Sequence, residues 1–138
     1  MFPTSTRFLL VDDYSTMRKV MKKILNDMGY LHIFEAVDGK NAFETLQAQH
    51  QKNEPIDFVI SDWNMPNLLG IDLLKKCRES TQFRTVHFML VTAESEGDQI
   101  RDAVKAGVSE YILKPYSPQK IKEKIESIYR KKQNSPNT

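Results

Sequence analysis

The stretch FLLVDD at residues 8–13 carries the pattern that decides the fold of this chain. Its four consecutive apolar residues predict a buried strand, because a strand covered by helices on both faces has no polar side. Similar short runs follow at residues 58–61, 88–91 and 110–113. Polar side chains stand at or just past the end of each run. In a parallel sheet, these strand ends would meet along one edge, where sites form.

Helix-like segments alternate with these runs. After the first strand, apolar residues recur at spacings of three and four from Met17 to Met28, and Gly29 ends this pattern. Residues 32–36 predict a further strand, and residues 47–54 a polar connection. Four more helices are expected: one opened by Asp38-Gly39, Gly70 to Glu79, Ser95 to Ala106, and one capped by Ser117-Pro118. Five β-α units predict a parallel sheet with helices on both faces.

Length and composition indicate one soluble domain spanning residues 1–138, with a core of about 5–130 and a flexible tail at 133–138. The net charge of +2 gives no reason to expect nucleic acid. The basic residues of 120–132 are interpreted as a solvated helix face rather than a phosphate- or membrane-binding patch.

Cys77 is the single cysteine, which excludes an internal disulfide and predicts a buried, inert thiol. No apolar run is long enough to cross a bilayer and the single cysteine fits a reducing compartment, so we expect a cytoplasmic protein without a membrane partner. We also expect a monomer.

Five side chains with chemical potential stand at the strand ends: Asp12, Asp13, Asp62, Thr92 and Lys114. Adjacent carboxylates about 4 Å apart repel by about 4 kcal/mol at an effective dielectric of 20, unless a cation lies between them. Carboxylate oxygens suit Mg²⁺, which uses one or two protein carboxylates. Alternatively, Asp12 or Asp13 only caps the following helix. The third carboxylate, Asp62, favours a shared metal.

Asp62 can also act as a nucleophile toward phosphorus and form an acyl phosphate. A metal would offset the repulsion between this carboxylate and an anionic donor. Lys114 can pair with Asp62 or with phosphoryl oxygens, and the Thr92 hydroxyl can donate a hydrogen bond to them. Taken singly, Asp62 would be interpreted as a turn residue before Pro66 and Lys114 as a surface lysine. Because both are expected at the same edge of the sheet, a phosphoryl site is favoured.

Four motifs carry a resemblance to a known family: LVDDYSTMR at 10–18, ISDWNMPN at 60–67, VTAE at 91–94 and YILKPY at 111–116. The chain resembles response-regulator receiver domains, in particular stand-alone chemotaxis regulators of the CheY type, over about residues 5–130. The resemblance implies an α/β fold with a doubly wound, five-stranded parallel sheet of flavodoxin-like order 2-1-3-4-5 and five helices.

The resemblance also implies the roles of the acidic residues. Asp62 would accept a phosphoryl group from a sensor histidine kinase, the chemotaxis kinase. Asp13 and Asp62 would bind Mg²⁺ directly, Asp12 partly through water, and Asn64 through its backbone carbonyl. The protein would not be an enzyme beyond its own phosphorylation and slow phosphoaspartate hydrolysis, a rate tuned by Glu94 and Asn64.

In such a switch, Lys114 would pair with the phosphoryl group, Thr92 would move toward it and Tyr111 would swing inward. The altered surface, formed by the fourth helix, fifth strand and fifth helix, would bind a flagellar-motor switch protein. A phosphatase is an optional further partner. A single-domain phosphorelay shuttle with a non-flagellar target is the alternative within the same fold.

Two departures from the family pattern concern partners and loops rather than phosphorylation. Leu69 stands where the family often has an acidic residue, and residues 95–98 read SEGD without the paired lysines of well-known relatives. Two other classes fit less well. A haloacid-dehalogenase-like phosphohydrolase requires a second aspartate as general acid at the position of Asn64. A flavin-binding module must hold an anionic phosphate, for which the Asp12-Asp13 turn is poorly suited without a metal.

Overall fold

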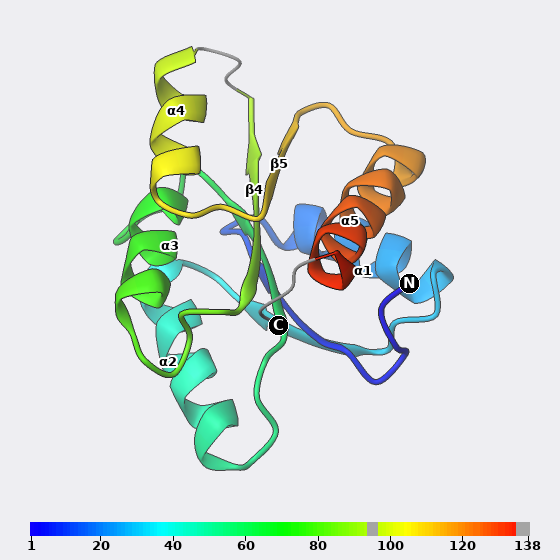
Figure 1. Cartoon of the computed structure of the whole chain (residues 1–138), viewed down its shortest axis with the longest axis horizontal. Helices are drawn as coiled ribbons and strands as arrows, with labels where there is room; N and C mark the ends of the chain where they lie inside the picture. Colours follow the sequence, from blue (N-terminus) through cyan, green and yellow to red (C-terminus); the bar gives the residue numbers. More distant parts are fainter. Residues whose placement is uncertain (94–96, 135–138) are drawn as a thin grey trace.

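The computed structural model describes residues 1–93 and 97–134, which form a parallel sheet covered by helices on both faces (Figure 1). The strands are β1 (Arg7–Val11), β2 (His32–Ala36), β3 (Phe58–Asp62), β4 (His87–Thr92) and β5 (Glu110–Leu113). The helices are α1 (Ser15–Asp27), α2 (Gly39–Gln51), α3 (Gly70–Glu79), α4 (Gly97–Lys105) and α5 (Pro118–Gln133). The strands pair in parallel in the order β2-β1-β3-β4-β5, so the predicted fold class and strand order are confirmed.

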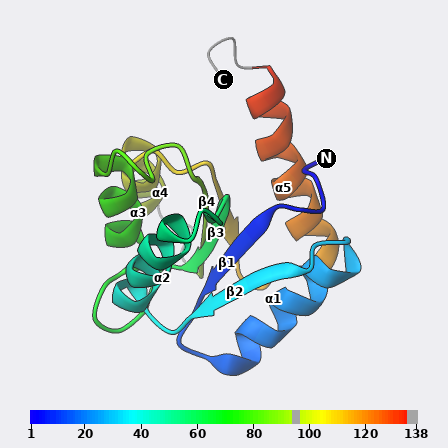
Figure 2. The ribbon, with the colours of Figure 1, turned by 90° about the horizontal axis from the view of Figure 1, so that it is seen from below.

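Helices α1 and α5 cover one face of the sheet, and α2, α3 and α4 cover the other (Figures 1 and 2). Because successive strand residues point to opposite faces, β1 contributes to two cores. Phe8 and Leu10 belong to the core beneath α1 and α5, whereas Leu9 and Val11 belong to the core beneath α2 and α3. This double burial explains why β1 is apolar at consecutive positions.

The helix ends follow the expected signals. Gly29 adopts a positive φ of 96° just beyond α1, and Gly107 adopts 89° beyond α4. Both are backbone conformations that glycine adopts without strain. The Ser117 side chain accepts a hydrogen bond from the Lys120 amide at 3.1 Å, which caps α5 as predicted.

Several boundaries differ from the expectation. Residues 47–54 were expected to be a polar connection, but α2 continues to Gln51. Glutamine and alanine are good helix formers, and Gln49 is buried, so this polar segment still has a packed side. The expected start of the fourth helix at Ser95 lies outside the described residues. Residues 135–138 of the expected tail also lie outside them, and α5 extends through Gln133.

Among the helices of residues 1–93 and 97–134, none has the length and apolar character that a membrane span requires.

Candidate functional site

The ends of β1 and β3 bring three carboxylates together. Asp12 and Asp13 directly follow β1, and Asp62 is the last residue of β3. One oxygen of each carboxylate lies within 4.8 Å of the others. Asp62 is buried with 7% of its surface exposed, Asp12 is half-buried and Asp13 is exposed. The cluster therefore runs from the interior of the sheet edge to solvent.

Neither aspartate of the β1 end serves as the N-cap of α1. The N-cap residue is Tyr14, and its side chain makes no capping hydrogen bond. Asp12 instead accepts a hydrogen bond from the Tyr14 amide at 2.9 Å through Oδ1. The alternative interpretation of Asp12 or Asp13 as a simple helix cap is therefore wrong.

Burial raises the pKa of Asp12, and the negative charges of Asp62 and Asp13 raise it further. The Tyr14 amide and the Lys114 charge act in the opposite direction without cancelling the shift. The cluster itself brings three carboxylates together with one ammonium, that of Lys114. Clustered carboxylate oxygens at this spacing fit a small divalent cation such as Mg²⁺, for which carboxylates and backbone carbonyls are suitable ligands.

Lys114 joins the cluster from β5. Its Nζ lies 3.2 Å from Oδ1 of Asp62, so the expected pairing of these two side chains is present. The Lys114 backbone amide donates a hydrogen bond to the Thr92 carbonyl at 2.8 Å. The peptide bond to Pro115 is cis. Lys114 therefore connects the ends of β3, β4 and β5.

Thr92 and Tyr111 belong to the neighbouring strands β4 and β5, and Tyr111 pairs with Leu90, two residues before Thr92. Thr92 is the last residue of β4 and is buried, with 3% of its surface exposed. Tyr111 is half-buried; its ring contacts the core beneath α2, α3 and α4. The Lys124 Nζ from α5 lies 5.3 Å from the centre of this ring. Glu94, the other residue expected here, lies outside the described residues.

The loop between β3 and α3, residues 63–69, directly follows Asp62. Asn64 is exposed on this loop. Gly70 follows the loop, and its backbone packs so closely against the Asp62 carbonyl oxygen that a Cβ at this position would clash with it. The Gly70 amide donates a hydrogen bond to the Trp63 carbonyl at 2.8 Å. From the sequence, Gly70 was expected only to start a helix; the structure shows that its missing side chain also lets the chain pack against the Asp62 carbonyl.

Sequence reasoning also missed Asp38 and Asn67. The Asn67 side-chain amide donates a hydrogen bond to Oδ2 of Asp38 at 2.7 Å, which joins the loop of residues 63–69 to the start of α2. The residues are 29 positions apart, so no local pattern links them. The sequence signal available was limited to Asp38 preceding Gly39, a usual helix start.

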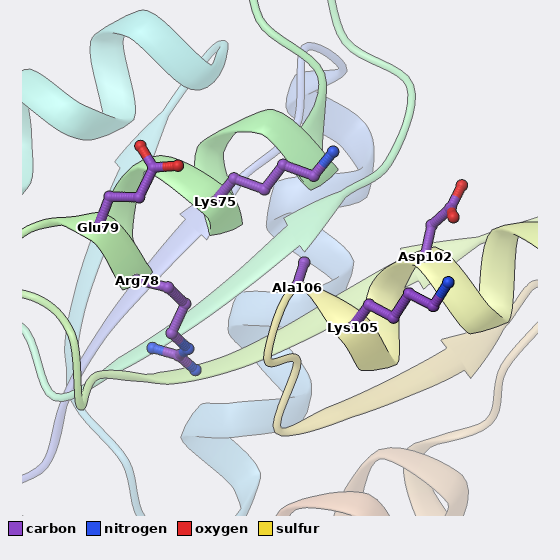
Figure 3. Close-up of a pocket in the computed structure, with 6 residues that line it drawn as sticks. All are labelled: Lys75, Arg78, Glu79, Asp102, Lys105 and Ala106. Carbon is purple, nitrogen blue, oxygen red and sulfur yellow. The ribbon is translucent and has the colours of Figure 1, made fainter.

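Among the described residues, Asp12 and Asp62 of the acidic cluster line a small hollow. The hollow that includes Asp12 and Asp62 holds only about 20 Å³, roughly the room of one water molecule. A larger hollow of about 370 Å³ lies between α3 and α4 and contains none of the cluster (Figure 3). Its Arg78 donates hydrogen bonds to the carbonyls of Gly107, Arg84 and Val86, which assigns this side chain to structure.

Comparison with known proteins places the chain within one family. The model for the response regulator receiver domain matches residues 8–126. The chemotaxis protein CheY of Pseudomonas aeruginosa is 44% identical over 123 residues, covering 89% of this chain and 95% of that protein. The chemotaxis protein CheY1 of Helicobacter pylori is 41% identical over 122 residues, covering 88% and 95%. The structure of the chemotaxis response regulator CheY4 of Vibrio cholerae matches with a TM-score of 0.77 at 27% identity, covering 89% and 98%.

Proposed function

This chain belongs to the family of response regulator receiver domains, and we propose on that premise that it is a phosphorylation-dependent switch of chemotaxis. The observation that carries the proposal is the cluster of Asp12, Asp13 and Asp62, with Lys114 held 3.2 Å from Asp62. The chemotaxis names of relatives at 41–44% identity support this role over that of a phosphorelay shuttle.

The chemistry proposed for Asp62 is acceptance of a phosphoryl group. A carboxylate oxygen of Asp62 attacks the phosphorus of a phosphohistidine on a sensor kinase. The new P–O bond forms as the P–N bond breaks, and the bonding electron pair goes to the imidazole nitrogen. Lys114 then offers its ammonium to the phosphoryl oxygens. Apart from this step and the slow hydrolysis of the acyl phosphate, we propose no enzymatic activity.

The proposed metal is Mg²⁺, held by Asp12, Asp13, Asp62 and the backbone carbonyl of Asn64. When bound, this ion neutralises the negative charge on the carboxylate and on the incoming phosphoryl oxygens. The protein's own contribution is to bring one oxygen of each of the three carboxylates within 4.8 Å of the others, at the ends of β1 and β3.

The switch would be driven by charge, because a phosphoryl group adds about −1.5 to −2 at neutral pH. We propose that Thr92 moves to donate a hydrogen bond to it and that Tyr111 follows by turning inward. The Tyr111 ring packs against the core beneath α2, α3 and α4 and lies near the Lys124 ammonium of α5, so a turn of this ring would change its contacts with both. The surface of α4, β5 and α5 would then bind a flagellar-motor switch protein.

The remaining parts of the proposal follow from the chemotaxis assignment. The donor would be the chemotaxis kinase, and a phosphatase could shorten the signal. The protein would act in the cytoplasm as a monomer.

Trp63 provides the test. It is the single tryptophan, follows Asp62 directly and is buried with 7% of its surface exposed. Its fluorescence is measured during addition of Mg²⁺ and then of acetyl phosphate. Mass spectrometry follows the gain of one phosphoryl group. The variants are Asp62→Asn and, as a matched control for the same chemical change, Asp102→Asn on the exposed side of α4.

We expect a saturable Mg²⁺ response in wild type and in Asp102→Asn, followed by a change that depends on acetyl phosphate. The Asp62→Asn variant should fold but show no response to the donor and no gain in mass. A folded wild-type protein without an Mg²⁺ response or phosphorylation would refute the proposal. Phosphorylation of Asp62→Asn would show that the acceptor is another residue.

A further inference from the structure

The short connection between β2 and α2 is hydrogen-bonded both to the residue that follows β1 and to the loop that follows Asp62. The Asp12 amide donates a hydrogen bond to the Ala36 carbonyl at 3.2 Å, beside the end of β1. Two residues further on, Asp38 accepts the hydrogen bond from Asn67 at 2.7 Å. Asn67 belongs to the same loop as Asn64. Residues 36–38 therefore link the strand end that carries Asp12 to the loop that carries Asn64.

Asp38 is itself held in place by α2. Its Oδ1 accepts a hydrogen bond from the Asn41 amide at 2.8 Å, which caps the helix, while Oδ2 faces Asn67. The Asn41 side chain accepts a hydrogen bond in return from the Val37 amide at 3.1 Å. The Asn41 amide, followed by the Asn67 side chain, lowers the pKa of Asp38, so this carboxylate is charged at neutral pH. It is a fixed anchor with both oxygens in use.

The part of the loop of residues 63–69 that contains Asn67 and Leu68 contacts the start of α2. Asn67 has a φ of 70°, a left-handed conformation that asparagine tolerates better than most residues. A Cβ on Gly39 would lie 2.7 Å from the Cβ of Leu68, so the loop lies directly on the first residue of α2. The loop's two ends are fixed separately, by the Trp63 amide on the Val91 carbonyl and by the Gly70 amide on the Trp63 carbonyl.

We propose that Asp38 and Asn67 are positioning residues that set the Mg²⁺ affinity of the site, because their hydrogen bond holds the loop that carries the Asn64 carbonyl. This inference rests on the proposed function and deepens it. Neither residue belongs to the set that would hold the metal. Loss of such a supporting hydrogen bond typically weakens metal binding 10- to 100-fold, and we expect about tenfold here because the loop would supply only one ligand.

Two single variants break this contact while preserving the local backbone. Asp38→Ser keeps an oxygen that can cap α2 through the Asn41 amide, but serine is too short to reach Asn67. Asn67→Gly removes the donor, keeps access to a positive φ and leaves the net charge unchanged. Asn67→Gly is therefore the control for the charge that Asp38→Ser removes.

The measurements are the Mg²⁺ dissociation constant from Trp63 fluorescence, the rate of phosphorylation by acetyl phosphate at saturating Mg²⁺, and the urea midpoint. We expect both variants to bind Mg²⁺ about tenfold more weakly, with a near wild-type rate once Mg²⁺ saturates. The double variant should be no weaker than either single variant, because both changes break the same contact.

The failure of this inference can be told apart from failure of the proposed function. If the wild type itself does not respond to Mg²⁺, the proposed function is wrong and the inference falls with it. If wild type responds to Mg²⁺ but Asn67→Gly binds Mg²⁺ with an affinity within twofold of wild type, the positioning role is wrong and the proposed function stands. The same conclusion holds if only Asp38→Ser weakens binding, because that variant also loses a charge. A phosphorylation rate that stays low at saturating Mg²⁺ would also overturn it, because a role in metal affinity predicts recovery.

Discussion

Replacing Asp12 with asparagine should make the metal-free protein more stable and weaken its binding of Mg²⁺. The Oδ1 atom of Asp12 accepts a hydrogen bond from the Tyr14 amide, and the asparagine side-chain carbonyl can keep this bond. What the substitution removes is the charge. Because burial, Asp62 and Asp13 raise the pKa of Asp12, the stability gained by protonating it is present at low pH and lost as the pH rises through its folded-state pKa. At neutral pH, the charged carboxylate therefore destabilises the fold.

The magnitude follows from the geometry of the cluster. Two unit charges 4.8 Å apart, the outer limit for the carboxylate oxygens here, repel by about 3.5 kcal/mol at an effective dielectric of 20 and about 0.9 kcal/mol in bulk water. Asp12 is half-buried, so its repulsion lies between these values, and its attraction to Lys114 is lost as well. We expect a net gain of about 1–2 kcal/mol, or about 3–8 °C in Tm for a domain of this size.

Thermal unfolding in the presence of a chelator and then in saturating Mg²⁺ tests this expectation. The Asp12→Asn variant should unfold at a higher temperature than wild type in chelator, and Mg²⁺ should stabilise it less. The difference in chelator should shrink as the pH falls and Asp12 of the wild type becomes protonated. An Asp12→Asn protein that unfolds below wild type in chelator at neutral pH would refute the electrostatic reasoning. Asp102→Asn serves as the control, with little expected effect.

Three further predictions address other parts of the molecule. Lys114→Ala should still take up phosphate from acetyl phosphate but lose switching; a phosphorylated variant with normal partner affinity would contradict this. The Glu110 carboxylate forms ion pairs with the Nζ atoms of Lys124 at 3.2 Å and of Lys131 at 3.3 Å. Burial alone would raise the pKa of Glu110, but these lysines outweigh it and lower the pKa, so the stabilisation is lost as the pH falls through that lowered pKa. Glu110→Gln should therefore cost about 1–2 kcal/mol in urea unfolding at neutral pH and much less in acid; an equal cost at both would argue against the ion pairs. Burial raises the pKa of Cys77 to about 12, so a thiol reagent should modify it only after unfolding, and rapid modification of the native protein would show that it is accessible.

The strand ends could be predicted because their signals are local and repeated. Buried strands need consecutive apolar residues, and parallel strands place their carboxyl ends at one edge, which is why Asp12 and Asp62 were expected to meet. The end of α2 could not be predicted in the same way. Residues 47–51 are largely polar, and their helical state depends on a side of the helix that is packed only in the folded protein, as at Gln49.

Gly70 and Asp38 were missed in the sequence for a different reason. Gly70 matters because the Asp62 carbonyl lies where its side chain would be, and Asp38 matters because Asn67 approaches it from a distant loop. Close approaches of backbone to backbone, and hydrogen bonds across 29 positions, leave no periodic signal. The sequence showed only Gly70 at a helix start and Asp38 before Gly39, and such residues are common to many helix starts.

The destabilisation that we predict for the acidic cluster and its proposed function have the same physical origin, the repulsion between its carboxylates. An isolated pair of carboxylates would relax by moving apart, but Asp62 is a buried residue of β3, a strand paired with β1 on one side and β4 on the other. Gly70 brings the next turn of chain against the Asp62 carbonyl, which leaves little room for a shift. The repulsion therefore persists in the folded protein and can be relieved by a cation, by protonation of Asp12 or by removal of a charge. Because binding of a ligand to the folded state adds to stability, a cluster that costs the metal-free fold more should gain more from Mg²⁺. The rigidity of the sheet edge, rather than the number of carboxylates alone, is thus what would convert repulsion into metal affinity.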